Sequence, residues 1–158
     1  MNSISVCFVC LGNICRSPSA EAVMRDLVER AKLADRIVID SAGTGDWHIG
    51  EAPDERAQKA AKKRGYDLSK LRGRQVAAVD FARFALFIVM DDANAAALAA
   101  VCPPEHRDKI RLLMEFASRD DSRAWSSIPI SAARKVSKKC SISARTPAKA
   151  CSKPCARN

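Results

Sequence analysis

The strongest constraint on the fold is a short stretch in which a strand, a tight loop and a helix follow one another. Ile4 to Cys10 is a run of apolar, partly β-branched residues that is typical of a buried strand. Ser17-Pro18-Ser19-Ala20-Glu21 then opens a helical pattern that continues to about Ala31. Only the loop from Leu11 to Arg16 separates the two. This order predicts an α/β domain with a functional loop at the end of its first strand.

Strands and helices go on alternating along the chain. We predict further strands over 36–40, 85–89 and 110–114, and helices over 53–64 and 91–101, the first of which ends at Gly65. Alternation of this kind is typical of parallel βαβ units. We therefore expect a doubly wound α/β fold with a parallel four-stranded sheet and flanking helices. Ligands of such folds bind beyond the carboxyl ends of the strands, where the loop after Cys10 lies.

The charge divides the chain into two parts. Of the 27 Lys and Arg residues, eight lie in 124–158, which holds no Asp or Glu; the other 19 nearly balance the 18 acidic residues. The net charge of +9 therefore belongs to the tail. We predict one domain over 1–123 and a basic, mostly disordered tail over 124–158. The tail lacks aromatic residues apart from Trp125, so we do not expect nucleic acid as a partner.

The chain shows no apolar run of the roughly 18–20 residues that span a bilayer, and no secretion signal at its N-terminus. We expect a cytoplasmic protein without a membrane partner, in which the seven Cys are reduced. His48 and His106 are far apart in sequence, so we expect neither a metal site nor a cofactor.

The loop after the first strand has the composition of a phosphate site. Backbone N–H groups at a helix N-terminus can hold phosphate oxygens, Gly12 and Asn13 tolerate the positive φ angles that such a loop needs, and Arg16 offers a bidentate fork. The same groups favour the thiolate form of Cys10, which is a nucleophile for phosphorus. The alternative interpretation of Cys10 is a small thiol buried in the core. The predicted phosphate-binding residues are Leu11, Gly12, Asn13, Ile14, Cys15 and Arg16.

The spacing Cys-x5-Arg is weak by itself, because Cys151 to Arg157 also fits it without a glycine, a strand or a helix. The context of the first match is more specific. Val9-Cys-Leu-Gly-Asn-Ile-Cys-Arg-Ser-Pro-Ser-Ala-Glu-Ala resembles the low-molecular-weight protein tyrosine phosphatases, and Asp40-Ser-Ala-Gly-Thr, Arg74-Gln and Met90-Asp-Asp-Ala-Asn resemble later segments of that family. The resemblance covers about residues 4–116 and implies hydrolysis of phosphotyrosine through a cysteinyl-phosphate.

The resemblance also implies roles for individual residues. Cys10 would be the nucleophile, Arg16 the phosphate clamp, Asn13 the side chain that holds the loop, and Ser17 a donor to the thiolate. The implied partners are a phosphotyrosine protein or a small aryl phosphate, with inorganic phosphate as product. Trp47 would contact the substrate ring, although an ordinary part-buried Trp is an equal alternative.

Other polar residues have a structural and a functional interpretation. By the resemblance, Cys15 can trap an oxidised nucleophile as a disulfide, but it can also fill space in the interior. We expect Cys7 to face the core. Asp40, Asp91 and Asp92 follow predicted strands and could frame the site, although the last two suit helix caps.

The end of the chain departs from the family pattern. The family's Asp-Pro-Tyr segment, whose Asp protonates the leaving group, is absent. Ser127-Ile-Pro-Ile-Ser-Ala-Ala-Arg, written in plausible codons and read two nucleotides later, yields Asp-Pro-Tyr-Phe-Gly-Gly-Ala. We therefore hypothesise a frame slip shortly before Trp125, and a phosphatase impaired by loss of its acid; Asp120 and Asp121 are the nearest carboxylates. Alternatives are an arsenate reductase of the same fold, and a phosphate-binding module without turnover.

Overall fold

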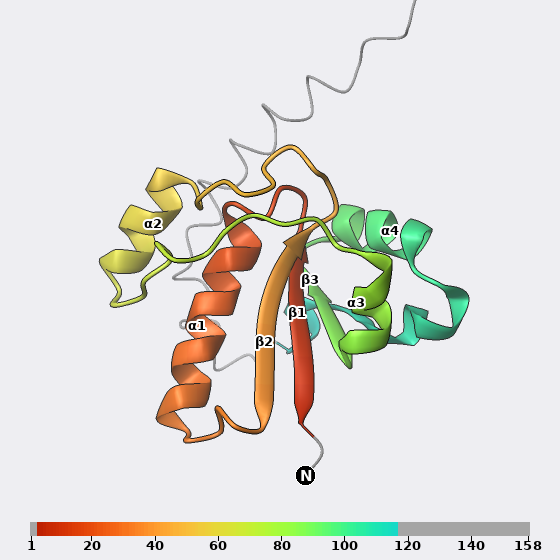
Figure 1. The fold of residues 1–158 in the computed structure, drawn as a ribbon, viewed down its shortest axis with the longest axis horizontal. Helices are drawn as coiled ribbons and strands as arrows, with labels where there is room; N and C mark the ends of the chain where they lie inside the picture. The colour runs from red at the N-terminus through yellow and green to blue at the C-terminus, as the bar shows by residue number, and fades with distance from the viewer. Residues whose placement is uncertain (1–2, 117–158) are drawn as a thin grey trace, which may run out of the picture.

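The structure, a computed structural model, describes residues 3–116. Its elements in chain order are β1 (Ile4–Cys10), α1 (Arg16–Arg30), β2 (Ile37–Gly43), α2 (Glu55–Lys62), α3 (Ala78–Arg83), β3 (Leu86–Val89), α4 (Asp92–Val101) and β4 (Ile110–Leu112). Two short 3-10 helices flank β4, at Pro104–Lys109 before it and at Leu113–Phe116 after it. The strands pair in parallel in the order β2-β1-β3-β4 (Figure 1). The predicted parallel four-stranded sheet is confirmed, whereas the predictions for 124–158 lie outside the described residues.

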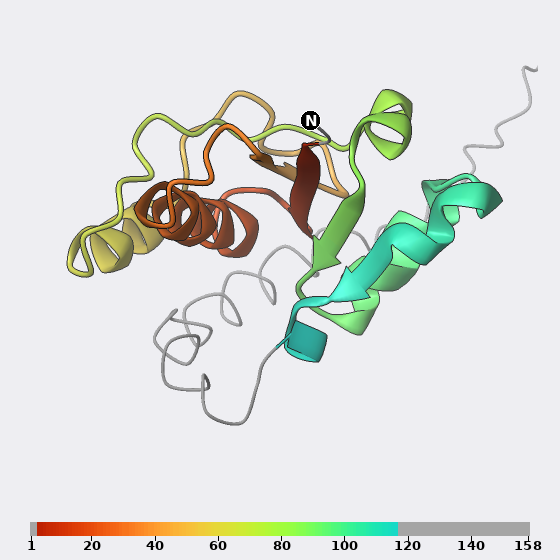
Figure 2. The ribbon, with the colours of Figure 1, turned by 90° about the horizontal axis from the view of Figure 1, so that it is seen from below.

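Helices cover both faces of this sheet (Figure 2). Val6 and Phe8 of β1 point to the face that packs against α1. Their neighbours Cys7 and Val9 point to the other face, which packs against α3 and α4. Because β1 is buried on both sides, its sequence is a continuous apolar run rather than an alternation with polar residues. Cys7 faces the core, as predicted.

The helix α2 lies outside α1 rather than on the sheet. Ala57 and Ala61 of α2 pack with Ala22 of α1 in a small cluster of apolar residues. The predicted stop of this helix is confirmed, because Gly65 adopts a φ of 89° just beyond its end. The helix is shorter than predicted because its N-terminal cap is Asp54, whose carboxylate accepts a hydrogen bond from the next residue but one.

Two sequence predictions differ from the structure in informative ways. We expected Asp40 to follow its strand at the edge of the sheet, which is wrong. The strand β2 continues to Gly43 because it pairs with β1 as far as Cys10, and Asp40 lies within it opposite Cys7. The Asp40 carboxylate is tolerated there because its Oδ2 lies 2.9 Å from Nη2 of Arg74. The other difference is α3, which the sequence did not predict.

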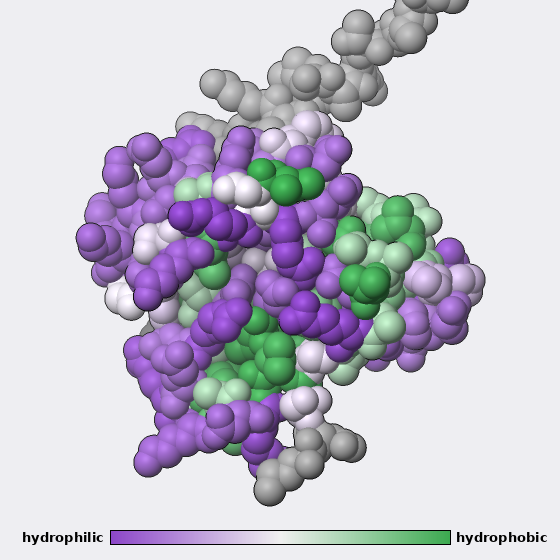
Figure 3. All heavy atoms as spheres, viewed as in Figure 1, coloured by the Kyte–Doolittle hydropathy of each residue, from purple (hydrophilic) through white to green (hydrophobic). Residues whose placement is uncertain are grey.

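Polar and charged side chains cover most of the face drawn in Figure 3. Apolar side chains gather in this view over the lower part of the sheet and beside α4. Ile4 and Val38, near the starts of β1 and β2, are among the exposed large apolar residues. Within the part of the chain that the structure describes, no helix combines the length and the apolar character that crossing a bilayer requires.

Candidate functional site

The site is positioned by the order of the strands. The neighbours of β1 are β2 on one side and β3 on the other, so the chain reverses its direction of winding at β1. A crevice outside the carboxyl ends of the strands is expected at such a point. The loop from Leu11 to Cys15 leaves β1 there and enters α1 directly (Figure 1). We call this segment the phosphate loop.

The backbone of the phosphate loop turns its carbonyl groups outward. The carbonyl oxygen of Leu11 accepts a hydrogen bond from the N–H of Gly45 at 2.9 Å, and that of Ile14 accepts one from the N–H of Asp54 at 2.7 Å. In a planar trans peptide the C=O and the following N–H point in opposite directions. The N–H groups of Gly12 and Cys15 therefore point away from these outer partners, and that of Asn13 points to the sulfur of Cys10. Such donors beside the first turn of α1 suit an anion.

One of the two predicted positive φ angles is present. Asn13 has a φ of 52°, as predicted, but Gly12 does not enter the left-handed region. At Gly12 the missing side chain serves a close approach instead. A Cβ at this position would lie 3.0 Å from Cδ2 of His48, which is tighter than ordinary van der Waals contact.

The thiol of Cys10 lies at the floor of the phosphate loop, where the side chain is buried. Its Sγ is 3.0 Å from Oγ of Ser17 and accepts the backbone N–H of Asn13 at 3.3 Å. The N–H of Asn13 donates to the sulfur, and the hydroxyl of Ser17 lies within hydrogen-bond distance of it. Donors on sulfur favour a thiolate over a thiol. The expected proximity of Ser17 to Cys10 is therefore observed.

The side chain of Asn13 ties the loop to its surroundings. Its Nδ2 donates to Oγ of Ser17 at 2.8 Å and to Oγ of Ser41 at 2.9 Å. Its Oδ1 accepts the backbone N–H of Arg74 at 2.9 Å. Asn13 thus uses its whole amide group and is 2% exposed, which is the geometry expected of a residue that holds the loop.

Arg16, the predicted phosphate clamp, lies at the first position of α1 and contacts Asp91. Its Nη1 is 2.5 Å from Oδ2 of Asp91, whose Oδ1 also accepts the backbone N–H of Asn94 and so caps α4. Burial alone would raise the pKa of Asp91, but the hydrogen bonds from Arg16 and Asn94 hold it below its ordinary value. Asp91 therefore frames the site and caps a helix, whereas Asp92 lies in the first turn of α4.

Comparison with known proteins decides which family has this site. The family model described as low molecular weight phosphotyrosine protein phosphatase matches residues 5–129. The chain belongs to this family. A relative of the same description from Schizosaccharomyces pombe is 46% identical over 73% of this chain and 74% of its own length. The low molecular weight protein-tyrosine-phosphatase YfkJ of Bacillus subtilis is 41% identical over 75% of this chain and 76% of its own.

Solved structures of the same family agree with the fold. The crystal structure of Bacillus subtilis YfkJ matches with a TM-score of 0.72 at 39% identity, over 75% of each chain. A protein tyrosine phosphatase from Entamoeba histolytica, with Hepes in its active site, matches with a TM-score of 0.71 at 39% identity, over 74% of each chain. This low molecular weight protein-tyrosine-phosphatase is a phosphoric monoester hydrolase.

Trp47 lies on the loop that borders the phosphate loop of this phosphatase. Trp47 is 60% exposed. The ring covers Gly45, where a Cβ would lie 1.7 Å from Cζ3 of Trp47. Gly45 in turn donates to the carbonyl of Leu11. An exposed ring beside the phosphate loop fits a contact with substrate, which stays a prediction.

The second thiol of the loop differs from the first. Burial raises the pKa of Cys15 to about 11, with Asp54 adding to the effect. Burial also raises the pKa of Cys7 well above its ordinary range. At neutral pH both are therefore thiols, and with Cys10 and Cys102 they are the free cysteines of the described residues.

Sequence reasoning missed His48, which it considered only as a metal ligand. Its ring packs on Gly12, and its Nδ1 lies 2.6 Å from Oε2 of Glu51. Nothing in the sequence signals this contact except its position next to Trp47. Within 3–116 no group of His, Cys, Asp and Glu side chains is arranged to hold a metal ion.

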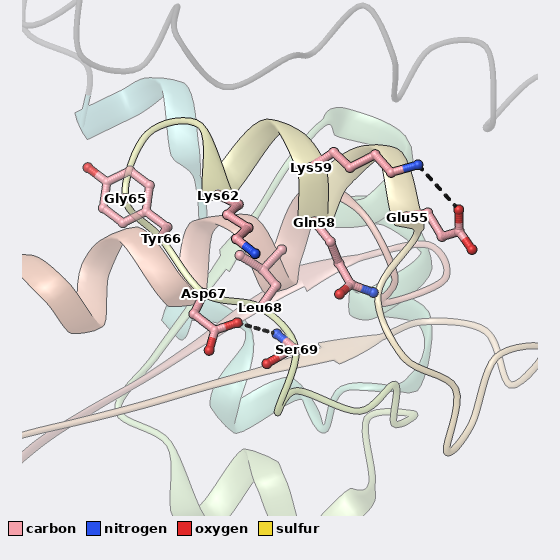
Figure 4. A pocket seen from close by; sticks show the side chains of 9 residues that line it. All are labelled: Glu55, Gln58, Lys59, Lys62, Gly65, Tyr66, Asp67, Leu68 and Ser69. Atoms are coloured by element: carbon pink, nitrogen blue, oxygen red, sulfur yellow. Dashed lines mark hydrogen bonds and ion pairs between the residues drawn. The ribbon is translucent and has the colours of Figure 1, made fainter.

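A depression also lies between α2 and the segment that follows it (Figure 4). None of its nine lining residues is a predicted site residue. Lys59 lies 3.6 Å from Glu55, and Asp67 accepts the backbone N–H of Ser69, so these charges have local partners. The phosphate loop therefore remains the candidate active site.

Proposed function

We propose that this chain hydrolyses phosphotyrosine and other aryl phosphate monoesters through a cysteinyl-phosphate intermediate on Cys10. One observation carries the proposal: the buried sulfur of Cys10 accepts the backbone N–H of Asn13 within the phosphate loop and lies 3.0 Å from the hydroxyl of Ser17. A phosphate held by the N–H groups of the loop and by Arg16 presents its phosphorus to that sulfur, the near-attack geometry that enzymes use.

In the first step the sulfur attacks phosphorus. An S–P bond forms, the bond from phosphorus to the aryl oxygen breaks, and the phenolate leaves and takes up a proton. Arg16 and the N–H groups stabilise the charge on the equatorial oxygens. In the second step water attacks phosphorus, the S–P bond breaks, inorganic phosphate leaves, and Ser17 donates to the departing thiolate at Cys10.

The proton for the phenolate needs an acid, and Asp91 does not serve. Its lowered pKa keeps it ionised at neutral pH, so it has no proton to give. The sequence contains no Asp-Pro-Tyr segment, which supports an enzyme impaired on poor leaving groups. The hypothesised frame slip and the substitute acids Asp120 and Asp121 lie outside the described residues.

The alternatives receive less support from the geometry. An arsenate reductase of this fold relays electrons through a second thiolate near the first. Cys15 is the neighbouring thiol in the loop, and its raised pKa disfavours the thiolate form. A phosphate-binding module without turnover uses the same loop but has no need of a buried sulfur that accepts a backbone N–H and lies beside a hydroxyl.

Cys10→Ser tests the proposal. The variant should lose hydrolysis of p-nitrophenyl phosphate and of a phosphotyrosine peptide, while binding of inorganic phosphate persists because Arg16 and the N–H groups remain. A serine variant that turns over normally would show that the nucleophile is elsewhere. A wild-type protein that binds phosphate but hydrolyses neither substrate would favour the binding module.

A further inference from the structure

The charges of the described residues are separated along the chain. Residues 54–74, which form α2 and the segment after it, hold eight Lys and Arg but three Asp and Glu. The rest of 3–116 holds nine Lys and Arg against 13 Asp and Glu, so it is net negative. A domain with this separation attracts acidic partners to its positive part.

The positive charge of α2 lies on the side of the helix that faces away from α1. Ala57 and Ala61 are buried in the cluster that joins α2 to α1. With 3.6 residues per turn, the opposite side of α2 carries its exposed charged residues. Four of these are bases, which we call the basic face: Arg56, Lys59, Lys62 and Lys63.

Only part of the basic face is neutralised. Arg56 and Lys59 each pair with an acidic side chain at the start of α2. Among the described residues, no acidic oxygen lies within ion-pair distance of Lys62 or Lys63. Lys59 is three and four positions before these two lysines, a spacing at which like charges repel each other on a helix. An acidic ligand on this face would relieve that repulsion.

The basic face starts beside the phosphate loop. The N–H of Asp54, the cap of α2, donates to the carbonyl of Ile14 in that loop at 2.7 Å. Cys15 of the loop packs against the same cluster as α2. From Asp54 to Lys63 the helix rises by about 14 Å, which an extended peptide spans in about four residues. A peptide whose phosphotyrosine lies in the loop therefore has the length to reach the far end of the face.

We propose that the basic face of α2 binds acidic residues of the substrate that lie about four positions from the phosphotyrosine. This rests on the function proposed above, because it names the sequences that the site at Cys10 prefers. The alternative is a solvated face whose lysines only stabilise the C-terminal end of α2 through the helix dipole. The first requires an affinity that depends on the charge of the peptide, and the second changes stability alone.

The experiment measures Kd for labelled phosphotyrosine peptides by fluorescence anisotropy in the Cys10→Ser background, so it needs no turnover. One peptide carries Glu three to five positions from the phosphotyrosine, before it or after it in separate syntheses, and its match carries Gln there. The test variant is Lys62→Gln with Lys63→Gln. Gln and Lys have similar helix propensities, so α2 should stay folded.

The matched control is Lys32→Gln with Arg36→Gln, which removes the same charge. Both residues are exposed and directly precede β2, at the edge of the sheet opposite the phosphate loop. Every variant keeps the basic residues of 124–158, so any effect of these cancels in the comparison.

With Lys62 and Lys63 present, the Glu peptide should bind about 2- to 30-fold more tightly than the Gln peptide, the range for two exposed ion pairs. The preference should disappear in Lys62→Gln with Lys63→Gln and persist in the control. It should also shrink at about 0.5 M NaCl, because salt screens exposed charges. Binding of inorganic phosphate should stay the same in all variants.

Equal affinity for the two peptides, or a preference that survives the loss of Lys62 and Lys63, would overturn the proposal. A preference lost equally in the control would also overturn it, because net charge alone would then explain the effect. Binding to phosphatidylserine vesicles that depends on the two lysines, without a peptide preference, would assign the face to a membrane surface instead. Failure of the proposed function shows separately, as normal turnover by Cys10→Ser.

Discussion

Asp91 combines two interactions that two substitutions can separate. Its Oδ1 caps α4 through the N–H of Asn94 at 2.7 Å, and its Oδ2 pairs with Arg16. Asn is as good a helix cap as Asp but carries no charge, so Asp91→Asn removes the ion pair alone. Asp91→Ala removes both. Activity should therefore fall in both variants, which lose the charge, and stability should fall mainly in Asp91→Ala, which also loses the cap.

The magnitudes follow from the geometry. Losing the cap costs about 1 kcal/mol, within a range of about 0.5–2. The ion pair is worth less, about 0.2–1 kcal/mol, because the Asp91 side chain is 43% exposed and solvent screens the charges. Asp91→Ala should thus be about 1 kcal/mol less stable than Asp91→Asn, or roughly 4 °C in Tm. Both variants should lose kcat/KM to a similar extent, up to about 100-fold, because Arg16 loses its orientation.

The pH dependence supplies an internal check. The pKa of Asp91 is lowered in the folded state, so the ionised carboxylate contributes stability above its unfolded pKa of about 4, and loses this contribution as pH falls through the folded value. Urea unfolding of wild type and Asp91→Asn should therefore differ at pH 6 and converge toward pH 3. Equal stability of the Asn and Ala variants, or full activity of the Asn variant, would refute this assignment of roles.

Three further predictions concern the clamp, the loop packing and the leaving group. Arg16→Lys should reduce kcat/KM strongly and weaken phosphate inhibition, because a point charge cannot bridge two equatorial oxygens; a variant with normal kinetics would exclude the clamp. Gly43→Ala places a Cβ 2.9 Å from the carbonyl oxygen of Leu11, so the loop must move. We expect the free energy of unfolding, measured with urea, to fall by about 1–3 kcal/mol, and activity to fall as well. Without the acid, rates on aryl phosphates should fall steeply as the pKa of the leaving phenol rises, since general acids contribute about 10²–10⁴-fold. A shallow dependence on that pKa, kept after Asp120 and Asp121 are both changed to Asn, would contradict the claim that the enzyme lacks a general acid.

The elements that local pattern determines were predictable. The strand from Ile4 to Cys10 has the predicted bounds, because an apolar run that ends in a tight loop fits few other kinds of secondary structure. The helix α3 was missed because it is short and no Ser, Thr or Asn precedes it. Its first turn is held instead by Asp80, which accepts the N–H of Ala77 and pairs with Arg74.

The site was predictable where one loop contains it. Cys10, Asn13, Arg16 and Ser17 lie within eight consecutive positions, so the motif alone places them together. The contacts of Asp91 with Arg16, and of Ser41 with Glu21, join residues from different elements, and only the packing of the sheet brings them within hydrogen-bond distance. No pattern along the chain encodes such distances, which is why Glu21 carried no prediction.

The central claim is that Cys10 carries the phosphoryl group between the two steps. Rapid acid quench of the enzyme during turnover of a phosphotyrosine peptide, followed by peptide mapping, measures this directly. The account predicts one phosphoryl group on the peptide that contains Cys10, present in wild type and absent in Cys10→Ser. A phosphoryl group on another residue, or turnover that proceeds with none on the protein, would contradict it.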